Sequence, residues 1–188
     1  MHNKISTWLY RISSSYLAII STVIFMLFLI LVMPDQTAQA ALYSAEAGAP
    51  DTTVFYSVDN LLHMAESYGE QGRQAYIHAR FTFDLAFPLV YTFFLAVCTS
   101  WMLDRLRLSG NNWRLLNLLP LAAMVFDFLE NSCTAIVMAA YPHGRPLAAQ
   151  LAVIFTPMKW LFVAAAFVLL VVASLLISIR SIRERKNH

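Results

Sequence analysis

The sequence predicts an all-α protein: a four-helix transmembrane bundle with an extracytoplasmic loop that contains a short amphipathic helix. Composition, four long apolar runs and the placement of basic residues lead to this prediction. Of 188 residues, 59% are hydrophobic and 13% are charged, whereas soluble domains carry roughly 25% charged residues. A helix needs about 20 apolar residues to cross a bilayer. Four crossings and their loops would therefore occupy the chain as a single integral membrane domain, residues 1–188.

The predicted spans cover approximately residues 16–33, 78–103, 115–141 and 149–178, with an outer loop at 34–75. The first run has no charged residue, and Pro34 is expected to end it. The second helix is expected to start near Gly72 and to enter the membrane around Phe81. A short basic turn joins the second and third spans, and a turn with two prolines, Pro142 to Pro146, joins the third and fourth.

The first run also fits a second interpretation. A basic head, an apolar run and the tripeptide Ala38-Gln39-Ala40 together resemble a secretory signal with its cleavage site. The run is longer than the usual ~7–15 residues of a signal core, and the tripeptide lies several residues beyond it. Both features favour a retained helix, and a cleaved signal stays the alternative.

The outer loop is acidic, with no Lys or Arg between Pro34 and Gln71. Its first part, Gln36 to Pro50, is mostly small and polar and is expected to be a loose loop. Ser57 is expected to cap a short helix that ends at Gly69. The apolar residues of that helix predict that it lies on the membrane surface or folds over the mouth of the bundle.

The basic residues predict the orientation of the spans. The head, the middle turn and the tail hold nine Lys and Arg residues, and the opposite side holds three. Because Lys and Arg concentrate in cytoplasmic loops, both termini are expected in the cytoplasm, with the protein in the cytoplasmic (inner) membrane. The net charge of +2 is too small to suggest nucleic acid as a partner.

Helical spacing places the polar residues of the spans on two faces. In the second span, Tyr76, Arg80, Asp84, Pro88 and Tyr91 form a single stripe. In the third, Asp127, Glu130, Asn131 and Thr134 form another. Charged groups at membrane depth must face other helices or water, so both stripes are expected to point into the bundle.

Counting along the helices predicts which charges meet. At ~1.5 Å per residue, Glu130 lies about 16 Å from Tyr141, and Lys159 lies roughly 18 Å from Leu147. Glu130 and Lys159 are therefore expected at one level, either as a buried ion pair that sets helix register or as part of a site. Asp127 is the deepest group and has no evident cation, so it is expected to be hydrogen-bonded by Asn131, a tyrosine or the backbone, or to be uncharged.

These residues define a candidate polar pocket and three functional hypotheses. The leading one is a membrane protein that binds a small or lipid-like ligand, or a partner, in a pocket open to the outside. The second is an intramembrane enzyme in which Asp127 or Glu130 acts as acid or base on an apolar substrate. The third is a proton-coupled transporter, which with four spans and no inverted repeat would have to form a homodimer. The predicted pocket residues are Arg80, Asp84, Asp127, Glu130, Asn131 and Lys159.

The sequence predicts no cofactor and no metal site, because Cys98 and Cys133 are isolated and no metal-ligand spacing occurs. The segments YIHARFTFDLAFPLVY, FDFLEN and TPMKW resemble those of a broad, uncharacterised group of small bacterial four-span membrane proteins. The resemblance covers about residues 55–165. It implies a bacterial cytoplasmic membrane and no particular activity.

Overall fold

The computed structural model describes residues 4–44, 47–106, 111–143 and 145–186. Within these residues every regular element is a helix. Four stretches are long and apolar enough to cross a membrane: Ser15–Ser44, Gly69–Leu106, Leu115–Ala140 and Pro146–Arg185. This confirms the prediction of an all-α chain with four long apolar helices. Arg107 of the predicted basic turn and Gly144 of the predicted proline turn lie outside the described residues.

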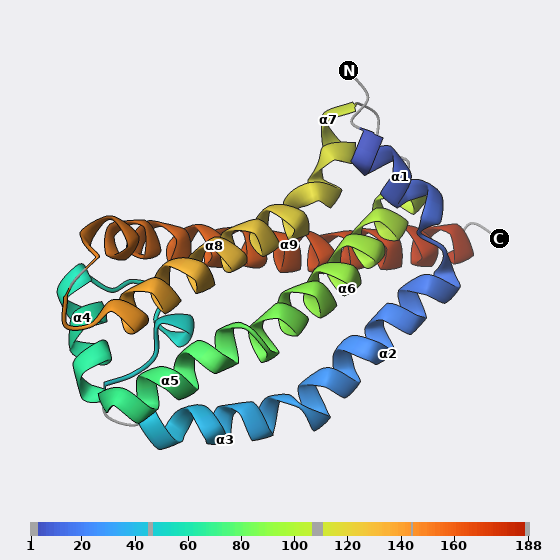
Figure 1. The fold of residues 1–188 in the computed structure, drawn as a ribbon. Coiled ribbons are helices and arrows are strands. Elements are labelled where there is room, and N and C mark those ends of the chain that lie inside the picture. The colour runs from blue at the N-terminus through green and yellow to red at the C-terminus, as the bar shows by residue number, and fades with distance from the viewer. Residues whose placement is uncertain (1–3, 45–46, 107–110, 144, 187–188) are drawn as a thin grey trace.

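The first described residues, predicted only as a short basic head, form a helix. Helix α1 (Lys4–Ile12) precedes α2 (Ser15–Leu31). Ser14 caps α2 by accepting a hydrogen bond from the backbone N–H of Leu17. Figure 1 shows α1 and α7 toward one end of the bundle, called the α1 end below, and α4 at the other, called the α4 end.

The expectation of a loose loop from Gln36 to Pro50 is wrong for its first part. Helix α3 (Met33–Ser44) follows α2 almost without a break, so helical structure continues past Pro34. Proline is tolerated in the first turn of a helix, where its missing N–H is not needed. The alanine- and glutamine-rich run behind it has high helix propensity. The predicted loose loop is therefore helical up to Ser44, and a 3-10 turn, Pro50–Thr52, lies near its end.

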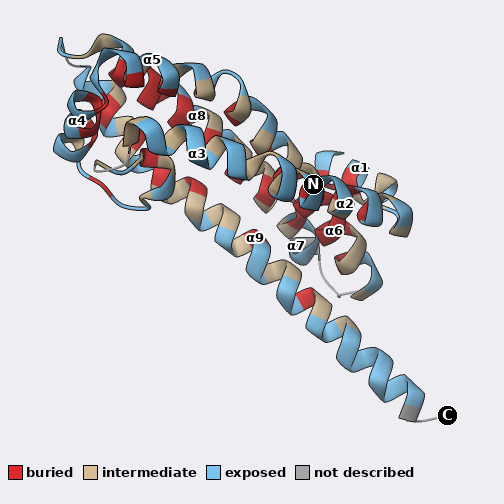
Figure 2. Cartoon of the chain, turned by 90° about the horizontal axis from the view of Figure 1, so that it is seen from below, coloured by how far each residue is buried: buried red, intermediate tan, exposed pale blue. Residues whose placement is uncertain are grey.

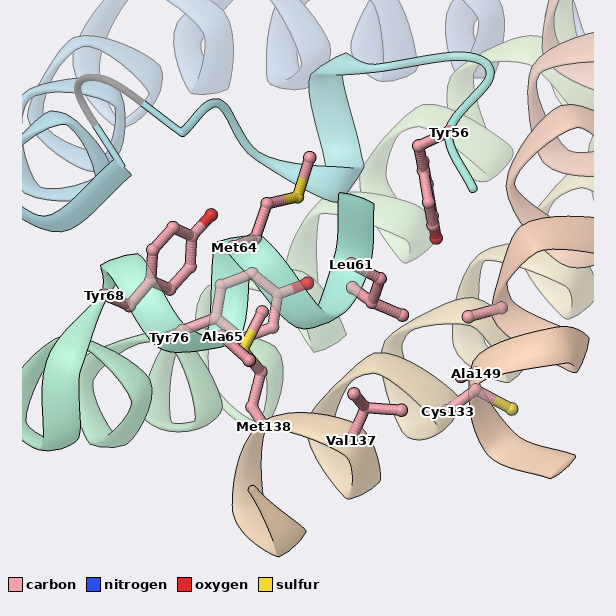
Figure 3. Close-up of a cluster of buried hydrophobic side chains, with 11 residues drawn as sticks. Tyr56, Leu61, Met64, Ala65, Tyr68, Tyr76, Cys133, Val137, Met138 and Ala149 are labelled. Carbon is pink, nitrogen blue, oxygen red and sulfur yellow. The ribbon is translucent and has the colours of Figure 1, made fainter. Parts of the chain in front are cut away.

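Helix α4 (Val58–Ser67) lies in the region where the sequence predicts a short helix. Ser57 and Asn60 form a reciprocal capping box at its start. The chain turns at Gly69, whose φ of 62° lies in the left-handed region that glycine adopts without strain. The apolar face of α4, including Leu61, Met64 and Ala65, packs into a buried cluster with residues of α8 and α9 (Figure 3). Helix α4 therefore packs against α8 and α9.

The second apolar stretch consists of two helices, α5 (Gly69–Arg80) and α6 (Phe83–Leu106). The sequence analysis expected one helix here, but it is interrupted at Phe81 and Thr82. Pro88 lies inside α6 and cannot donate to the carbonyl of Asp84 four residues earlier. That carbonyl instead accepts a hydrogen bond of 3.4 Å from the Asn131 side chain. The proline therefore gives the polar stripe of α8 (Leu119–Ala140) a backbone partner on α6.

The chain then returns through α7 (Asn111–Arg114), a 3-10 turn η2 (Leu115–Leu118), α8 and the long α9 (Pro146–Lys186). In Figure 2 the later part of α9 projects away from the other helices, and most of it is exposed. Two hydrophobic clusters stabilise the bundle. One lies at the α4 end (Figure 3), and the other joins α2, α6, α8 and α9. Along α8, Asp127, Glu130 and Asn131 lie between the residues of the two clusters.

Candidate functional site

Both predicted polar stripes are buried inside the bundle. Tyr76 and Arg80 of α5 are 0% and 6% exposed, and Asp84, Pro88 and Tyr91 of α6 are also buried. The interruption at Phe81 and Thr82 does not separate the two halves of the stripe. On α8 the four predicted residues, Asp127, Glu130, Asn131 and Thr134, are likewise buried. The i, i+3, i+4 spacing therefore predicted the buried faces correctly.

Arg80 is the centre of one half of the site. Its guanidinium pairs with Asp84 at 2.8 Å, one turn further along the chain, and with Asp51. It also donates a hydrogen bond of 3.2 Å to Asn131 Oδ1 and lies over the ring of Tyr76, 4.3 Å from the ring centroid. A guanidinium can contact all these groups because its planar fork carries five donors.

Asp51 is a residue of this site that the sequence does not predict. It lies in the acidic loop, 29 positions before Arg80 and in a segment with no helical periodicity. The structure places it on a short 3-10 turn against Arg80, with 27% of its side chain exposed. Within the network Asp51 is the group that reaches the surface.

Lys159 is the centre of the other half. Its Nζ lies 2.5 Å from Glu130 Oε2, so the predicted pairing of these two residues is present. Nζ also lies 3.9 Å from Asp127 Oδ1. The expectation that Asp127 has no cation at its depth is therefore wrong. Counting compared helix positions only, whereas a lysine ammonium sits on a flexible four-carbon stem that reaches a neighbouring turn.

Hydrogen bonds join the two halves into one network. Asn131 accepts from Arg80 and donates to Asp127 Oδ1 at 3.1 Å. Tyr91 donates to the other carboxylate oxygen, Asp127 Oδ2, at 3.0 Å. The expectation that Asn131 and a tyrosine hold Asp127 is thus confirmed. A continuous polar connection runs from Asp51 at the surface to Tyr91 and Glu130 in the core.

The network contains more carboxylates than cations. Asp51, Asp84, Asp127 and Glu130 stand against Arg80 and Lys159. The Glu130 side chain is 0% exposed, and its Oε1 atom has no hydrogen-bond donor among the described residues. A buried acceptor without a donor is costly. With all four carboxyls ionised the network would be two charges negative, and an additional donor, a positive charge or bound protons would offset this.

The segment of residues 47–57, between α3 and α4, contacts the network and its surroundings at the α4 end. The Tyr68 hydroxyl donates to the carbonyl of Gly48 at 2.7 Å, and the hydroxyls of Tyr56 and Thr156 lie 2.8 Å apart. Burial raises the pKa of Tyr56, so this hydroxyl keeps its proton. With the Asp51 ion pair, these contacts hold the segment against α5 and α9. Residues of this segment therefore lie against Arg80, which is 6% exposed.

The described residues contain no group of three or more His, Cys, Asp or Glu side chains arranged to hold a metal ion. The charged network consists of carboxylate, ammonium, guanidinium, amide and phenol groups. Groups of these kinds are able to form hydrogen bonds and, apart from the guanidinium and amide, to exchange protons. No protein-family model matches the chain, and no curated protein or solved structure shows significant similarity to it.

Proposed function

We propose that the chain is a multi-pass protein of a bacterial cytoplasmic membrane, with both termini in the cytoplasm and the α4 end outside. Four helices of spanning length and the unequal distribution of Lys and Arg support this placement. A retained first helix is supported by its contacts. Trp101 donates to Ser15 at 3.1 Å, and Phe25 stacks on Phe94 at 4.6 Å.

Cysteine labelling of intact cells tests this orientation. In a variant with Cys98 and Cys133 replaced by alanine, we expect Asp59→Cys on α4 to react with a membrane-impermeant maleimide. Arg183→Cys on α9 is expected to react only after the cells are opened. Both positions are exposed, so burial does not explain a difference. The reverse labelling pattern would contradict the proposed topology.

We infer that the charged network binds a small or lipid-like ligand whose polar end carries hydrogen-bond donors or a positive charge. The observation that supports this most is the composition of the buried network, with four carboxylates, two cations and a Glu130 oxygen without a donor. Ionisable groups at membrane depth are costly, so a network with more carboxylates than cations there is a candidate functional site on physical grounds. The partly exposed Asp51 lies where a ligand from the outer side would first meet the network.

Thermal unfolding of the purified full chain in detergent tests the ligand site. Octylammonium, octanol and octanoate have the same chain length and differ in the charge of their polar end. A ligand that binds only the folded state raises the unfolding temperature. We expect octylammonium to raise it more than the other two, and Glu130→Gln to remove that difference. The matched control Asp59→Asn, an exposed carboxylate on α4, is expected to retain it. Equal shifts with all three probes would contradict the proposal.

A proton-coupled transporter is the second candidate, and the continuous polar connection favours it. Proton relays in membranes use such chains of carboxylates and hydrogen-bonding groups. Asp127 lies within this connection, between Asn131 and Lys159. In proteoliposomes, a proton flux that Asp127→Asn abolishes would support transport, provided that this variant is as stable as the wild type.

The intramembrane enzyme has less support, because no Ser, Thr or Cys side chain hydrogen-bonds to the carboxylates of the network in the described part of the chain.

A further inference from the structure

The α1 end carries a surface of basic and aromatic side chains that the charged network does not involve. On α1, Lys4, Trp8 and Arg11 follow i, i+4 and i+7 and share one face. Lys4 and Arg11 are exposed, and Trp8 is 55% exposed. Trp113, also 55% exposed, and the exposed Arg114 belong to the neighbouring helix α7.

The opposite face of α1 is anchored to the bundle. Ser6 and Leu9 are 3% and 6% exposed. Ser6 Oγ donates to Asn117 Oδ1 at 2.8 Å, and Asn117 Nδ2 donates back to the Ser6 carbonyl at 3.2 Å. Asn117 is completely buried and also donates to Ser100 of α6 at 3.0 Å. These contacts set the rotation of α1, and therefore the direction in which Lys4, Trp8 and Arg11 point.

Contacts with Tyr10 of α1 hold Arg114 beside that helix. Its guanidinium lies 4.0 Å from the centroid of the Tyr10 ring. The Tyr10 hydroxyl donates to the Arg114 carbonyl at 3.0 Å. Burial raises the pKa of Tyr10 to about 12, so this hydroxyl remains a donor. A cation stacked on an aromatic ring keeps its outward donors available for a phosphate.

The position of α1 in the chain identifies what this surface meets. Only Ser13 and Ser14 separate α1 from α2, which is the first helix of spanning length. A helix attached so closely to a span lies at the level of the lipid headgroups. Tryptophan favours this interface, and Lys and Arg near it attract anionic lipids. Arg105 of α6 adds a fourth exposed positive charge, and Asp104 is the nearby exposed acidic residue.

We propose that Lys4, Trp8, Arg11 and Arg114 form a binding surface for anionic phospholipid headgroups of the cytoplasmic leaflet. Trp8 inserts among the headgroups, while Lys4, Arg11 and Arg114 contact the phosphates. Asn117 is a positioning residue, because it contacts Ser6 and not the lipid. The surface requires the membrane placement proposed above but is independent of the ligand site.

Lipid binding of the full chain in nanodiscs tests this surface. The nanodiscs contain equal amounts of phosphatidylglycerol and phosphatidylcholine, and native mass spectrometry measures the ratio of the two lipids that stay bound. We expect the wild type to retain phosphatidylglycerol preferentially. Each Lys or Arg near an anionic membrane surface strengthens its attraction to anionic lipid. Lys4→Gln/Arg11→Gln is therefore expected to lower the preference for phosphatidylglycerol by about tenfold. The matched control Arg183→Gln/Arg185→Gln removes two exposed charges from the tail of α9 and is expected to lower it much less.

A second readout reports on Trp8 itself. The fluorescence difference between the wild type and Trp8→Phe isolates this tryptophan, and phosphatidylglycerol with brominated acyl chains is expected to quench it. Asn117→Ala is expected to weaken the quenching while Lys4 and Arg11 are still present. Equal loss of preference in the two double variants would overturn the proposal, since charge anywhere in the leaflet would then suffice. An unquenched Trp8 would also overturn it, and failure of the chain to enter nanodiscs would instead refute the membrane placement.

Discussion

Replacing Lys159 by methionine is expected to lower the free energy of unfolding by about 3–5 kcal/mol, the cost of leaving a buried charge without its partner. Lys159 Nζ lies 2.5 Å from Glu130 and 3.9 Å from Asp127. Within the described residues, no other Lys or Arg side chain pairs with either carboxylate. Methionine preserves most of the side-chain volume, so the loss reports on charge and not on packing. Titration of the detergent-solubilised chain with a denaturing detergent measures the change in the free energy of unfolding.

A double variant separates the ion pair from its surroundings. In Lys159→Met/Glu130→Gln the carboxylate of Glu130 is removed together with its cation, and replacing both members of a buried pair is often close to neutral. We expect the double variant to recover most of the lost stability. Arg183→Gln, an exposed charge on the same helix, is the control and is expected to leave stability unchanged. A double variant less stable than Lys159→Met would show that packing around Glu130, and not its charge, dominates.

The four-helix architecture was predictable because a bilayer restricts the possible elements so strongly. Apolar runs of spanning length have few alternatives to membrane helices, and the structure contains four stretches of that kind. Hydropathy was less informative about polar segments. Helix α3 has little apolar periodicity, and only the helix propensity of its alanines and glutamines indicated it. The interruption at Phe81 and Thr82 has no comparable signal, because the residues there are neither glycine nor proline.

The candidate site was predictable where helix geometry determined it. Two residues three or four positions apart on a helix must share a face, and this placed Glu130 and Asn131 correctly on the buried side of α8. Counting turns placed Lys159 at the level of Glu130. Asp51 could not be placed in this way, because residues 53–57 and helix α4 separate it from α5 and no common helical register relates the two.

The core of the network was predictable from the sequence and its edge was not, because the two lie on different kinds of secondary structure. Residues in the core, such as Glu130, lie on long helices whose regular periodicity determines which face each residue occupies. Asp51 lies on a short 3-10 turn whose position depends on side-chain contacts, including those of Tyr56 and Tyr68. Arg80 joins the core of the network to its edge, because it pairs with both Asp84 and Asp51. The contribution of Arg80 to the free energy of unfolding can be measured separately from that of Asp51.

Replacing Arg80 by glutamine is expected to lower the free energy of unfolding by about 3–5 kcal/mol, because two carboxylates lose their cation at once. The Arg80 side chain is 7% exposed, and Asp84 is held 2.8 Å from it. Asp51→Asn is expected to cost at most about 1 kcal/mol, since partly exposed ion pairs contribute little. Arg80→Lys is expected to fall between them, because an ammonium lacks the planar fork that contacts Asp51, Asp84 and Asn131 together.

The comparison of these variants by detergent-denaturant titration distinguishes two roles of Arg80. If Arg80 mainly neutralises the buried part of the network, Arg80→Gln must cost far more than Asp51→Asn. Equal losses in the two variants would mean that Arg80 acts chiefly as an anchor for the segment between α3 and α4. If Arg80→Gln costs far more, Asp51→Asn weakens the attachment of the segment between α3 and α4 while Arg80 stays paired with Asp84. The variant would then bind the octylammonium probe faster while Glu130 still determines how tightly it is held.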